Sequence, residues 1–274
     1  MLDRELLSEI RKVHADNLEV YGARKVHASL KRKGMSVARC TVERLMKAYG
    51  LQGISRSKGR KTTRSDGAET PRSVDRVQRQ FVAAAPNVLW VADLTYIRTH
   101  SGWAYAAFVL DVFSRMVVGW QVSTSMRTEL ALDALDMGLW TRRRTSQVVA
   151  GLIHHSDRGV QYRAVRYTER LEECDAATSV GSKGDSYENA MAEAFNSLFK
   201  AERIRNPVMR PREGWRGVGY LEWAVAEYID WFNHRRLHGE IDHIPPAEYE
   251  ATYWSNNATI DYGQRTALAE AGTR

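Results

Sequence analysis

The stretch Trp90-Val-Ala-Asp93-Leu-Thr-Tyr96 decides the fold, because it places a carboxylate in the middle of an apolar, strand-forming segment. A carboxylate buried alone is costly, so it normally loses its charge or finds a cation. Asp157 follows a second apolar run, and Glu193 lies in a segment that predicts a helix. If these three carboxylates converge, they predict a site for two Mg²⁺ ions. Such ions activate the attacking oxygen and stabilise the leaving oxygen of a phosphoryl transfer, so the pattern indicates an enzyme that cuts or joins nucleic acid.

The segments around these carboxylates predict a mixed sheet. Runs rich in Val, Tyr, Phe and Trp predict an antiparallel meander over residues 88–98, 103–113 and 116–123. Helices and strands then alternate, over residues 127–143, 148–154, 162–176 and 177–180, before the helix with Glu193. This order predicts an α/β fold of the ribonuclease H-like class, a mixed sheet with flanking helices. Asp93 is expected on the central strand, and Asp157 just beyond the end of its neighbour.

Residues 1–54 predict a small all-α helix-turn-helix domain before the sheet. Apolar residues at helical spacing predict helices over residues 2–19, 23–33 and 37–49, with Gly34 ending the second and Ser36 capping the third. One face of the third helix carries polar side chains placed to enter a DNA major groove, namely Thr41, Arg44 and Lys47. Any three-helix bundle has a charged outer face, so a purely structural role for this face remains the alternative.

Residues 55–80 predict a basic flexible linker, because they contain almost no large apolar side chain. The formal net charge is +7. Lys and Arg outnumber Asp and Glu by 19 to 9 in residues 1–79, whereas residues 80–274 carry 21 against 24. The excess positive charge is therefore amino-terminal. We expect Lys58, Arg60 and Lys61 to contact DNA phosphates, against the alternative of an inert solvated linker.

The remaining segments complete a catalytic unit over residues 81–250. A long amphipathic helix over residues 213–234 is expected to pack on the sheet, and residues 251–274 predict a polar tail. Cys40 and Cys174 have neither metal-ligand spacing nor a partner nearby, so no disulfide framework is expected and a reducing cytoplasm is favoured. No apolar run approaches the length of a membrane span, so no membrane partner is expected.

Several polar residues near the carboxylates compete for a functional role. His154 and His155 are adjacent on a strand and point to opposite faces, so they cannot chelate one ion and are expected to pack or hydrogen-bond. Ser156 lacks the glycine-framed turn of an exposed nucleophile. Turn or surface positions are expected for the other carboxylates, Asp111, Asp133, Asp136 and Asp185. Glu188 is assigned to the start of the helix, where a negative charge offsets the helix dipole.

The helix with Glu193 carries two further polar residues on the same face. Asn189 lies four residues before Glu193 and Lys200 seven after it. A carboxylate between an amide and an ammonium matches a metal ligand flanked by phosphate-contacting groups. An ordinary solvated helix face is the alternative.

Taken in order, these motifs resemble the OrfB-type transposases of bacterial insertion sequence family three, whose catalytic core is similar to that of retroviral integrases. The resemblance covers nearly the whole chain. The motifs that carry it are Tyr21-Gly-Ala-Arg24-Lys25-Val26, Arg44-Leu-Met-Lys-Ala-Tyr-Gly50-Leu51, Trp90-Val-Ala-Asp93-Leu-Thr95, Asp111-Val-Phe-Ser114-Arg115, His155-Ser-Asp157-Arg-Gly159-Val-Gln161-Tyr162, Glu188-Asn-Ala-Met-Ala-Glu193 and Trp231-Phe-Asn233-His-Arg235-Arg236-Leu-His238. Residues 158–192 separate Asp157 from Glu193, which is the spacing of that family.

The resemblance implies a D,D-E transposase in which Asp93, Asp157 and Glu193 bind two Mg²⁺ ions, with Mn²⁺ able to substitute. It implies that water or a DNA 3′-hydroxyl attacks a phosphodiester without a covalent enzyme intermediate. It adds Arg24 and Lys25 to Asn189 and Lys200 as candidate DNA contacts. The family usually has Asp before the asparagine where this chain has Glu188, a change outside the expected ligands.

The same resemblance implies where the protein acts and with what. The expected partners are double-stranded DNA, both insertion sequence ends and target, and further copies of the chain as a homo-oligomer on DNA. Related chains are often fused by frameshifting to an upstream-frame protein. The expected location is the bacterial cytoplasm, in association with the nucleoid.

Two other functions remain open from the sequence. A ribonuclease H-like nuclease would cut without joining, but a nuclease acting on any duplex has no need of the helix-turn-helix and basic linker. A transposase-derived repressor would bind DNA without catalysis, and the presence of all three carboxylates weighs against it.

Overall fold

A computed structural model describes residues 3–55, 83–157, 159, 161–162, 164–180 and 190–257 of the chain. Three helices form the amino-terminal domain, α1 (Asp3–Asp16), α2 (Ala23–Arg32) and α3 (Arg39–Ala48). They enclose a small apolar core that includes Ile10, Val26 and Val42. Gly34 follows α2 in the left-handed region, with φ 80°, as expected of a residue that ends a helix.

The third helix begins later than predicted, so Ser36 is not its cap. Ala38 precedes the first turn of α3 and makes no side-chain cap hydrogen bond. Met35 and Val37 pack against the apolar core. His27 Nε2 also lies 3.0 Å from the carbonyl oxygen of Val37. These contacts keep the connection extended and delay the helix until Arg39.

A five-stranded mixed sheet forms the second part of the molecule. Its strands are β1 (Leu89–Thr99), β2 (Gly102–Asp111), β3 (Val117–Ser123), β4 (Ile153–Ser156) and β5 (Ala177–Val180). The spatial order is β3-β2-β1-β4-β5. The first three strands pair antiparallel, whereas β4 pairs parallel with both β1 and β5. The predicted α/β architecture is thus confirmed, with β1 in the centre and β4 beside it.

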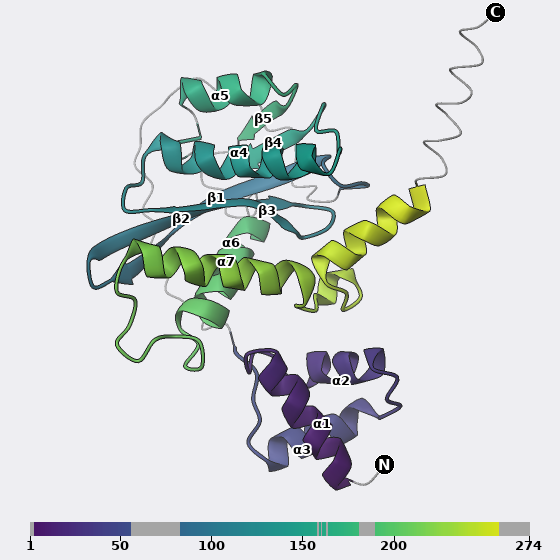
Figure 1. Ribbon diagram of the computed structural model, residues 1–274. Helices are drawn as coiled ribbons and strands as arrows, with labels where there is room; N and C mark the ends of the chain where they lie inside the picture. Colours follow the sequence, from purple (N-terminus) through teal and green to yellow (C-terminus); the bar gives the residue numbers. More distant parts are fainter. Residues whose placement is uncertain are drawn as a thin grey trace, which may run out of the picture.

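Helices cover both faces of this sheet (Figure 1). On one face α4 (Thr128–Arg144) and α5 (Val165–Glu172) pack around the buried Trp90. On the other face α6 (Ala190–Phe199) and α7 (Val218–His234) pack around Phe108. Because successive residues of a strand face opposite sides, the side of β1 that includes Val91 and Asp93 is turned toward α6.

Several elements differ from their predicted extent. Strand β4 starts at Ile153 because the amide of Leu152 closes a turn on the carbonyl of Val149. Trp215, predicted on the last long helix, precedes α7 and is buried with its indole N–H directed to the carbonyl of Ile204, 3.3 Å away. A helix over residues 246–257 extends into the segment predicted as an irregular tail. It packs on the core through Tyr249 and Tyr253, whose rings lie 5.2 and 4.9 Å from that of Phe113.

Asp111 was expected at a turn or on the surface; it does begin the turn after β2, but the surface position is wrong. The side chain is fully buried at the end of β2. Its carboxylate accepts hydrogen bonds from the amides of Asn87 and Ser114, and it lies 3.5 Å from the guanidinium of Arg142. Arg142 also pairs with Glu250, which comes from the helix over residues 246–257. Asp111 therefore belongs to a buried ion network that joins three elements, a role that requires contacts distant in sequence.

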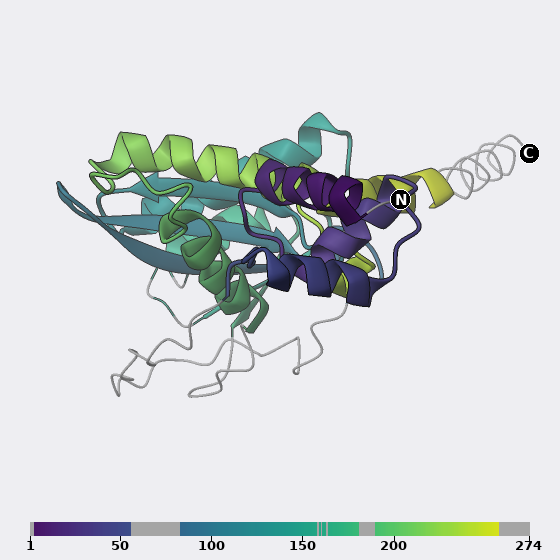
Figure 2. The ribbon, with the colours of Figure 1, turned by 90° about the horizontal axis from the view of Figure 1, so that it is seen from below.

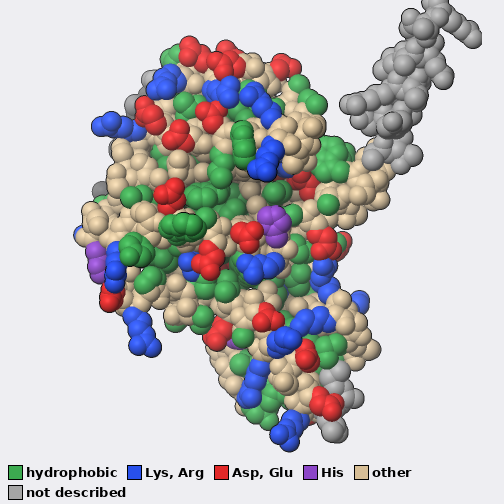
Figure 3. All heavy atoms as spheres, viewed as in Figure 1, with side chains coloured by type: hydrophobic (Ala, Val, Ile, Leu, Met, Phe, Trp, Pro, Cys, Tyr) green, Lys and Arg blue, Asp and Glu red, His purple; other side chains and the backbone are tan. Residues whose placement is uncertain are grey.

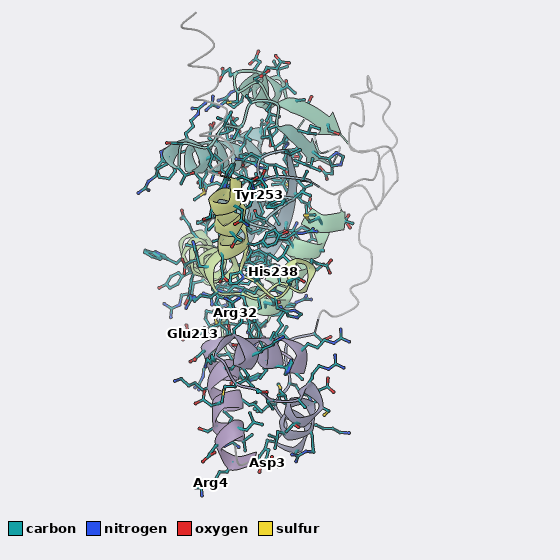
Figure 4. All side chains as sticks on the ribbon, turned by 90° about the vertical axis from the view of Figure 1, so that its right-hand side faces the viewer. Asp3, Arg4, Arg32, Glu213, His238 and Tyr253 are labelled. Carbon is teal, nitrogen blue, oxygen red and sulfur yellow. The ribbon has the colours of Figure 1, made fainter. Side chains whose placement is uncertain are left out.

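The amino-terminal domain lies against the segment that follows α7 (Figures 1 and 2). The hydroxyl of Tyr21 accepts a hydrogen bond from the Leu237 amide at 2.7 Å and donates one to the Arg235 carbonyl at 3.2 Å. The amide of Asn206 also donates to the Leu18 carbonyl at 2.9 Å. In Figure 4, Arg32 lies at this junction below His238, whereas Asp3 lies at the far end of the domain.

Candidate active site

Asp93 lies at the point where β1 loses its neighbour on one side. Strand β4 pairs only with Leu89–Ala92, so the edge of β1 beyond Ala92 is not covered by β4. The half-buried carboxylate accepts a hydrogen bond from the Leu94 amide at 2.8 Å and one from Asn196 Nδ2 at 2.9 Å. Asp93 is thus held by two neutral donors at an open position of the sheet.

Asp157 reaches the same region from β4. The strand register pairs Ala92 with Ser156, so Asp157 is the next residue along β4 as Asp93 is along β1. Parallel neighbours carry their ends to the same edge of a sheet, which is where ligands bind in such folds. The Gly159 amide donates to Asp157 Oδ1 at 2.9 Å and orients the carboxylate.

Glu193 approaches from the face covered by α6. It lies in the first turn of this helix, which packs on the sheet through Ala192, Phe195 and Phe199. Asn196 follows one turn later and is buried, so its hydrogen bond to Asp93 fixes α6 against β1. The glutamate is therefore placed by a helix whose position depends on aromatic packing and on one amide.

The pKa of Asp93 indicates that the three carboxylates lie near one another. Burial and the charge of Asp157, with a further contribution from Glu193, raise the pKa of Asp93 to about 7, against the lowering effect of its two hydrogen bonds. Each of the other two carboxylates thus lies within electrostatic reach of Asp93. Within the described part of the chain no group of three or more His, Cys, Asp or Glu side chains is arranged around a single ion position. Asp93 is the carboxylate on which both of the others act.

Two residues of this site were missed by sequence reasoning. Asn196 lies three residues after Glu193, so the same helical spacing that singled out Asn189 and Lys200 could have found it. The hydroxyl of Tyr162 is buried and has no hydrogen-bond partner among the described residues. Burial raises the pKa of Tyr162 well above its usual value, and the charges of Asp93 and Asp157 act in the same direction. Only its position in a Gln-Tyr pair soon after Asp157 could have indicated this residue.

The histidines next to Asp157 have the structural roles expected of them. His154 is buried, with Nε2 3.1 Å from the Tyr167 hydroxyl, and burial lowers its pKa to about 3. His155 is buried on the other face, with Nδ1 3.0 Å from the Ser179 hydroxyl. They lie on opposite sides of β4 and cannot share one ion.

Lys200 lies just beyond α6, in the first position of the π-helical turn η1 (Lys200–Ile204). Its Nζ is 4.4 Å from the centre of the Tyr96 ring. Burial lowers the pKa of Lys200, and Asp93 acts in the opposite direction. Asn189 lies outside the described residues.

The amino-terminal candidates are spread over the three-helix domain. Arg44 and Lys47 are exposed on α3 and Thr41 is half-buried. Arg24 is exposed on α2, whereas Lys25 lies with Nζ 5.3 Å from the Tyr21 ring centre. Figure 3 shows basic and acidic side chains side by side on this lobe. Lys58, Arg60 and Lys61 lie outside the described residues.

Comparison with known proteins defines the class first. The HTH-like domain family matches residues 1–59, and integrase core domain families match residues 83–186 and 193–253. The fold is similar to a chain of the simian T-cell lymphotropic virus intasome in complex with PP2A regulatory subunit B56 gamma, with TM-score 0.50 and 11% identity over 88% of this chain and 74% of that one. The chain is thus a helix-turn-helix protein with an integrase-like catalytic core, an enzyme of the polynucleotidyl transferase type.

Curated relatives define the family. The chain is 47% identical to a Shigella sonnei transposase for insertion sequence element IS629, over 94% of this chain and 83% of the relative. It is 34% identical to the Escherichia coli transposase InsF for insertion sequence IS3A, over 84% of this chain and 76% of the relative. The chain belongs to the OrfB-type transposases of insertion sequence family three, and its function is DNA transposition. None of the described helices is long and apolar enough to cross a membrane.

Proposed function

We propose that Asp93, Asp157 and Glu193 are the D,D-E triad of this transposase and hold two Mg²⁺ ions, with Mn²⁺ able to replace them. The observation that carries the proposal is the strand register that places Asp93 and Asp157 directly after the paired residues Ala92 and Ser156, with Asn196 of α6 hydrogen-bonded to Asp93 one turn from Glu193. The raised pKa of Asp93, caused by burial and by the other two carboxylates, agrees with this placement. A half-buried carboxylate between two others is unfavourable without a compensating cation. Divalent ions with oxygen ligands supply that compensation.

The charges of Asp157 and Glu193 both raise the pKa of Asp93, so Asp93 is the member of the triad that lies near the other two. Asp93 would therefore contribute to both ions, one with Asp157 and one with Glu193. Ions held in this way supply activation of the attacking oxygen and stabilisation of the leaving oxygen.

The chain's own residues keep the carboxylates in place. Asn196 and the Leu94 amide occupy hydrogen-bonding positions of Asp93, which fixes its orientation. The Gly159 amide does the same for Asp157. Lys200 contributes a positive charge on the Asp93 side, where a DNA phosphate has to approach. Cleavage then requires DNA to be positioned with its scissile phosphate between these groups.

The domains divide the work in this proposal. Residues 1–54 bind the insertion sequence ends through Thr41, Arg44 and Lys47, with Arg24 and Lys25 as further contacts. The linker over residues 55–80, with Lys58, Arg60 and Lys61, follows the DNA backbone, and residues 81–250, with Asn189 and Lys200 beside the triad, carry out cleavage and joining. The working form is a homo-oligomer on paired DNA ends, with or without an upstream-frame protein fused by frameshifting.

The triad is tested by Asp93→Asn, Asp157→Asn and Glu193→Gln, which remove charge but little volume. Each is expected to reduce Mg²⁺-dependent cleavage and joining of insertion sequence ends by about a thousandfold or more, since metal-assisted transition-state stabilisation contributes several kcal/mol. DNA binding measured with EDTA should be retained. Asp133→Asn is the matched control, because Asp133 is exposed on α4 outside the site. Near-normal joining by any triad variant would remove that residue from the site.

A further inference from the structure

Beyond the carboxylates, a row of four side chains runs over the β1–β2 hairpin, three of them exposed on the hairpin and the fourth the half-buried Lys200 of η1. In order they are Lys200, Tyr96, Trp103 and Arg98, and we call them the hairpin ladder. Lys200 Nζ lies 4.4 Å from the Tyr96 ring centre, and Arg98 Cζ lies 5.2 Å from that of Trp103. The two rings lie 5.3 Å apart and meet edge to face at 82°. The ladder thus has two aromatic rings in the middle and a cation at each end.

The ladder is exposed because the sheet extends beyond its helices at this point. The apolar cluster under α4 and α5 contains Trp90 and Ala92 and ends with the partly buried Leu94 and Tyr105. Tyr96 and Trp103 lie further along the hairpin, and they remain 46% and 47% exposed. Trp90 and Phe108 on the same strands are fully buried. Two exposed rings that are not needed for the core are available to a partner.

The ladder adjoins the candidate active site. Tyr96 is three residues beyond Asp93 on β1, roughly 10 Å along a strand, and because side chains alternate it lies on the other face of the sheet. Lys200 links the two regions, because it contacts the Tyr96 ring and its pKa responds to the Asp93 carboxylate. Strand β4 pairs with β1 only as far as Ala92, so among the described strands none pairs with this edge of β1 between Asp93 and Tyr96.

We propose that the hairpin ladder is a stacking platform for unpaired DNA bases next to the scissile phosphate. The inference rests on the proposed active site. Aromatic side chains flanked by cations bind single-stranded DNA, because bases stack on the rings while the cations face the phosphates. Bases within a duplex are already stacked on each other, so the platform acts only where the strand is unpaired. The ladder therefore distinguishes an opened DNA end from a closed one.

The test uses the full-length protein with EDTA, which prevents cleavage, and DNA carrying 2-aminopurine at an unpaired position beside the insertion sequence end. Stacking on an aromatic ring quenches the fluorescence of this base. We expect Tyr96→Ala and Trp103→Ala each to abolish the quenching and to weaken binding of the overhang DNA roughly 5- to 150-fold, the range for loss of one stacked base. Binding of the fully paired duplex should be unchanged.

Three comparisons keep the test specific. Tyr96→Phe and Trp103→Phe should retain the quenching, because they keep a ring. Trp103→Leu removes the aromatic ring but keeps apolar volume on the strand. It should therefore lose the quenching as Trp103→Ala does, and it keeps the test decisive if the alanine variant folds poorly. Trp223→Ala, at an 81% exposed position on α7, is the control for loss of a surface tryptophan.

Equal losses on paired and overhang DNA would overturn the proposal, as would unchanged quenching in Tyr96→Ala and Trp103→Ala. The result of the quenching test is independent of the result of the cleavage test on the carboxylate triad. Asp93→Asn should lose cleavage and keep the quenching, since the ladder is intact. If Asp93→Asn cleaved normally while the ladder variants lost quenching, the triad assignment would fail and the stacking platform would remain.

Discussion

Arg44, a proposed DNA contact of the helix-turn-helix domain, forms an ion pair in the structure. Its Nη2 donates to Asp3 Oδ2 at 2.8 Å, and both side chains are more than half exposed. An exposed ion pair contributes at most about 1 kcal/mol, so DNA can replace Asp3 as the partner of Arg44. Asp3 lies at the end of the domain distant from the catalytic core, which leaves this face open to a duplex (Figure 4).

Arg44→Ala is expected to lower discrimination between insertion sequence ends and random DNA by about 1–3 kcal/mol, if Arg44 contacts a base. Replacing Lys58, Arg60 and Lys61 together should instead weaken binding to both DNAs alike, because phosphates are the same in every sequence. Binding titrations of both DNAs at matched salt measure the difference. Arg39→Ala is the control, since Arg39 pairs with Glu43 on the same helix. Equal losses on both DNAs for Arg44→Ala would make Arg44 a phosphate contact.

Asp93 makes the metal-free protein sensitive to pH. Its pKa is raised to about 7, chiefly by burial and by Asp157, whereas the ordinary value is 3.8. A raised carboxyl pKa means that folding favours the protonated form. The stability associated with the proton is therefore complete below pH 4 and is lost as the pH rises to about 7.

In metal-free protein, Asp93→Asn should raise the midpoint of thermal unfolding relative to the parent chain, and this difference should be larger at pH 8 than at pH 5. Adding Mg²⁺ at pH 8 should stabilise the parent chain and not Asp93→Asn. Thermal scans at the two pH values, with and without Mg²⁺, measure both effects. The same difference at both pH values would show that Asp93 is not strained by its neighbours.

At the scale of elements, the approach of α4 to β3 depends on Gly119. A Cβ at this position would lie 2.0 Å from the Ala134 carbonyl oxygen and 2.7 Å from the Gly138 amide nitrogen. Backbone atoms of a packed helix cannot move aside cheaply, so the sheet and α4 fit only without a side chain here. The close contact seats α4 on β3 and the neighbouring β2.

Gly119→Ala should therefore destabilise the protein by about 1–3 kcal/mol or more, which corresponds to a fall of roughly 2–12 °C in the unfolding midpoint. Gly219→Ala on α7 is a matched control, because a Cβ there meets nothing within 4 Å. In a helix it should leave stability unchanged or raise it by about 0.5–1 kcal/mol. A Gly119→Ala protein as stable as the parent would mean that α4 can shift freely on the sheet.

At the scale of the whole molecule, Tyr21 joins the amino-terminal domain to the catalytic part. Burial raises the pKa of Tyr21 to about 12, so the hydroxyl stays protonated and can donate to the Arg235 carbonyl while it accepts from the Leu237 amide. The nearby ion pair between Arg32 and Glu248 is at 2.6 Å but exposed. The buried hydroxyl is expected to matter more than the visible charge pair.

Tyr21→Phe should lower the free energy of unfolding by about 1–3 kcal/mol, because it leaves a buried amide without an acceptor. Arg32→Gln should change it by less than about 1 kcal/mol. Urea unfolding of the full chain, followed by tryptophan fluorescence, compares the two. A larger effect of Arg32→Gln would show that the domains are held mainly by charge.

Much of the fold followed from local pattern. Alternating apolar residues placed β1, β2 and β3 within one or two residues, and helical spacing placed α4 similarly well, because burial periodicity is a local property. Asp93 stood out for the same reason, as a charge within an apolar strand. The boundaries of β4 and α7 were less accurate, since turns and packing decide where an element starts.

By itself the sequence determined the mixed α/β architecture, the three-helix domain and the family, because these depend on periodicity and on motifs in a fixed order. Only the tertiary structure decided that Asp111 joins a buried network with Arg142 and Glu250, that Asn196 holds Asp93, and that Tyr96 meets Lys200. Asp111 lies 31 positions from Arg142 and 139 from Glu250 along the chain. Asn196 lies 103 positions from Asp93, and Lys200 lies 104 from Tyr96. Contacts at such separations arise when the sheet and its helices pack, and no local pattern specifies which side chains then become neighbours.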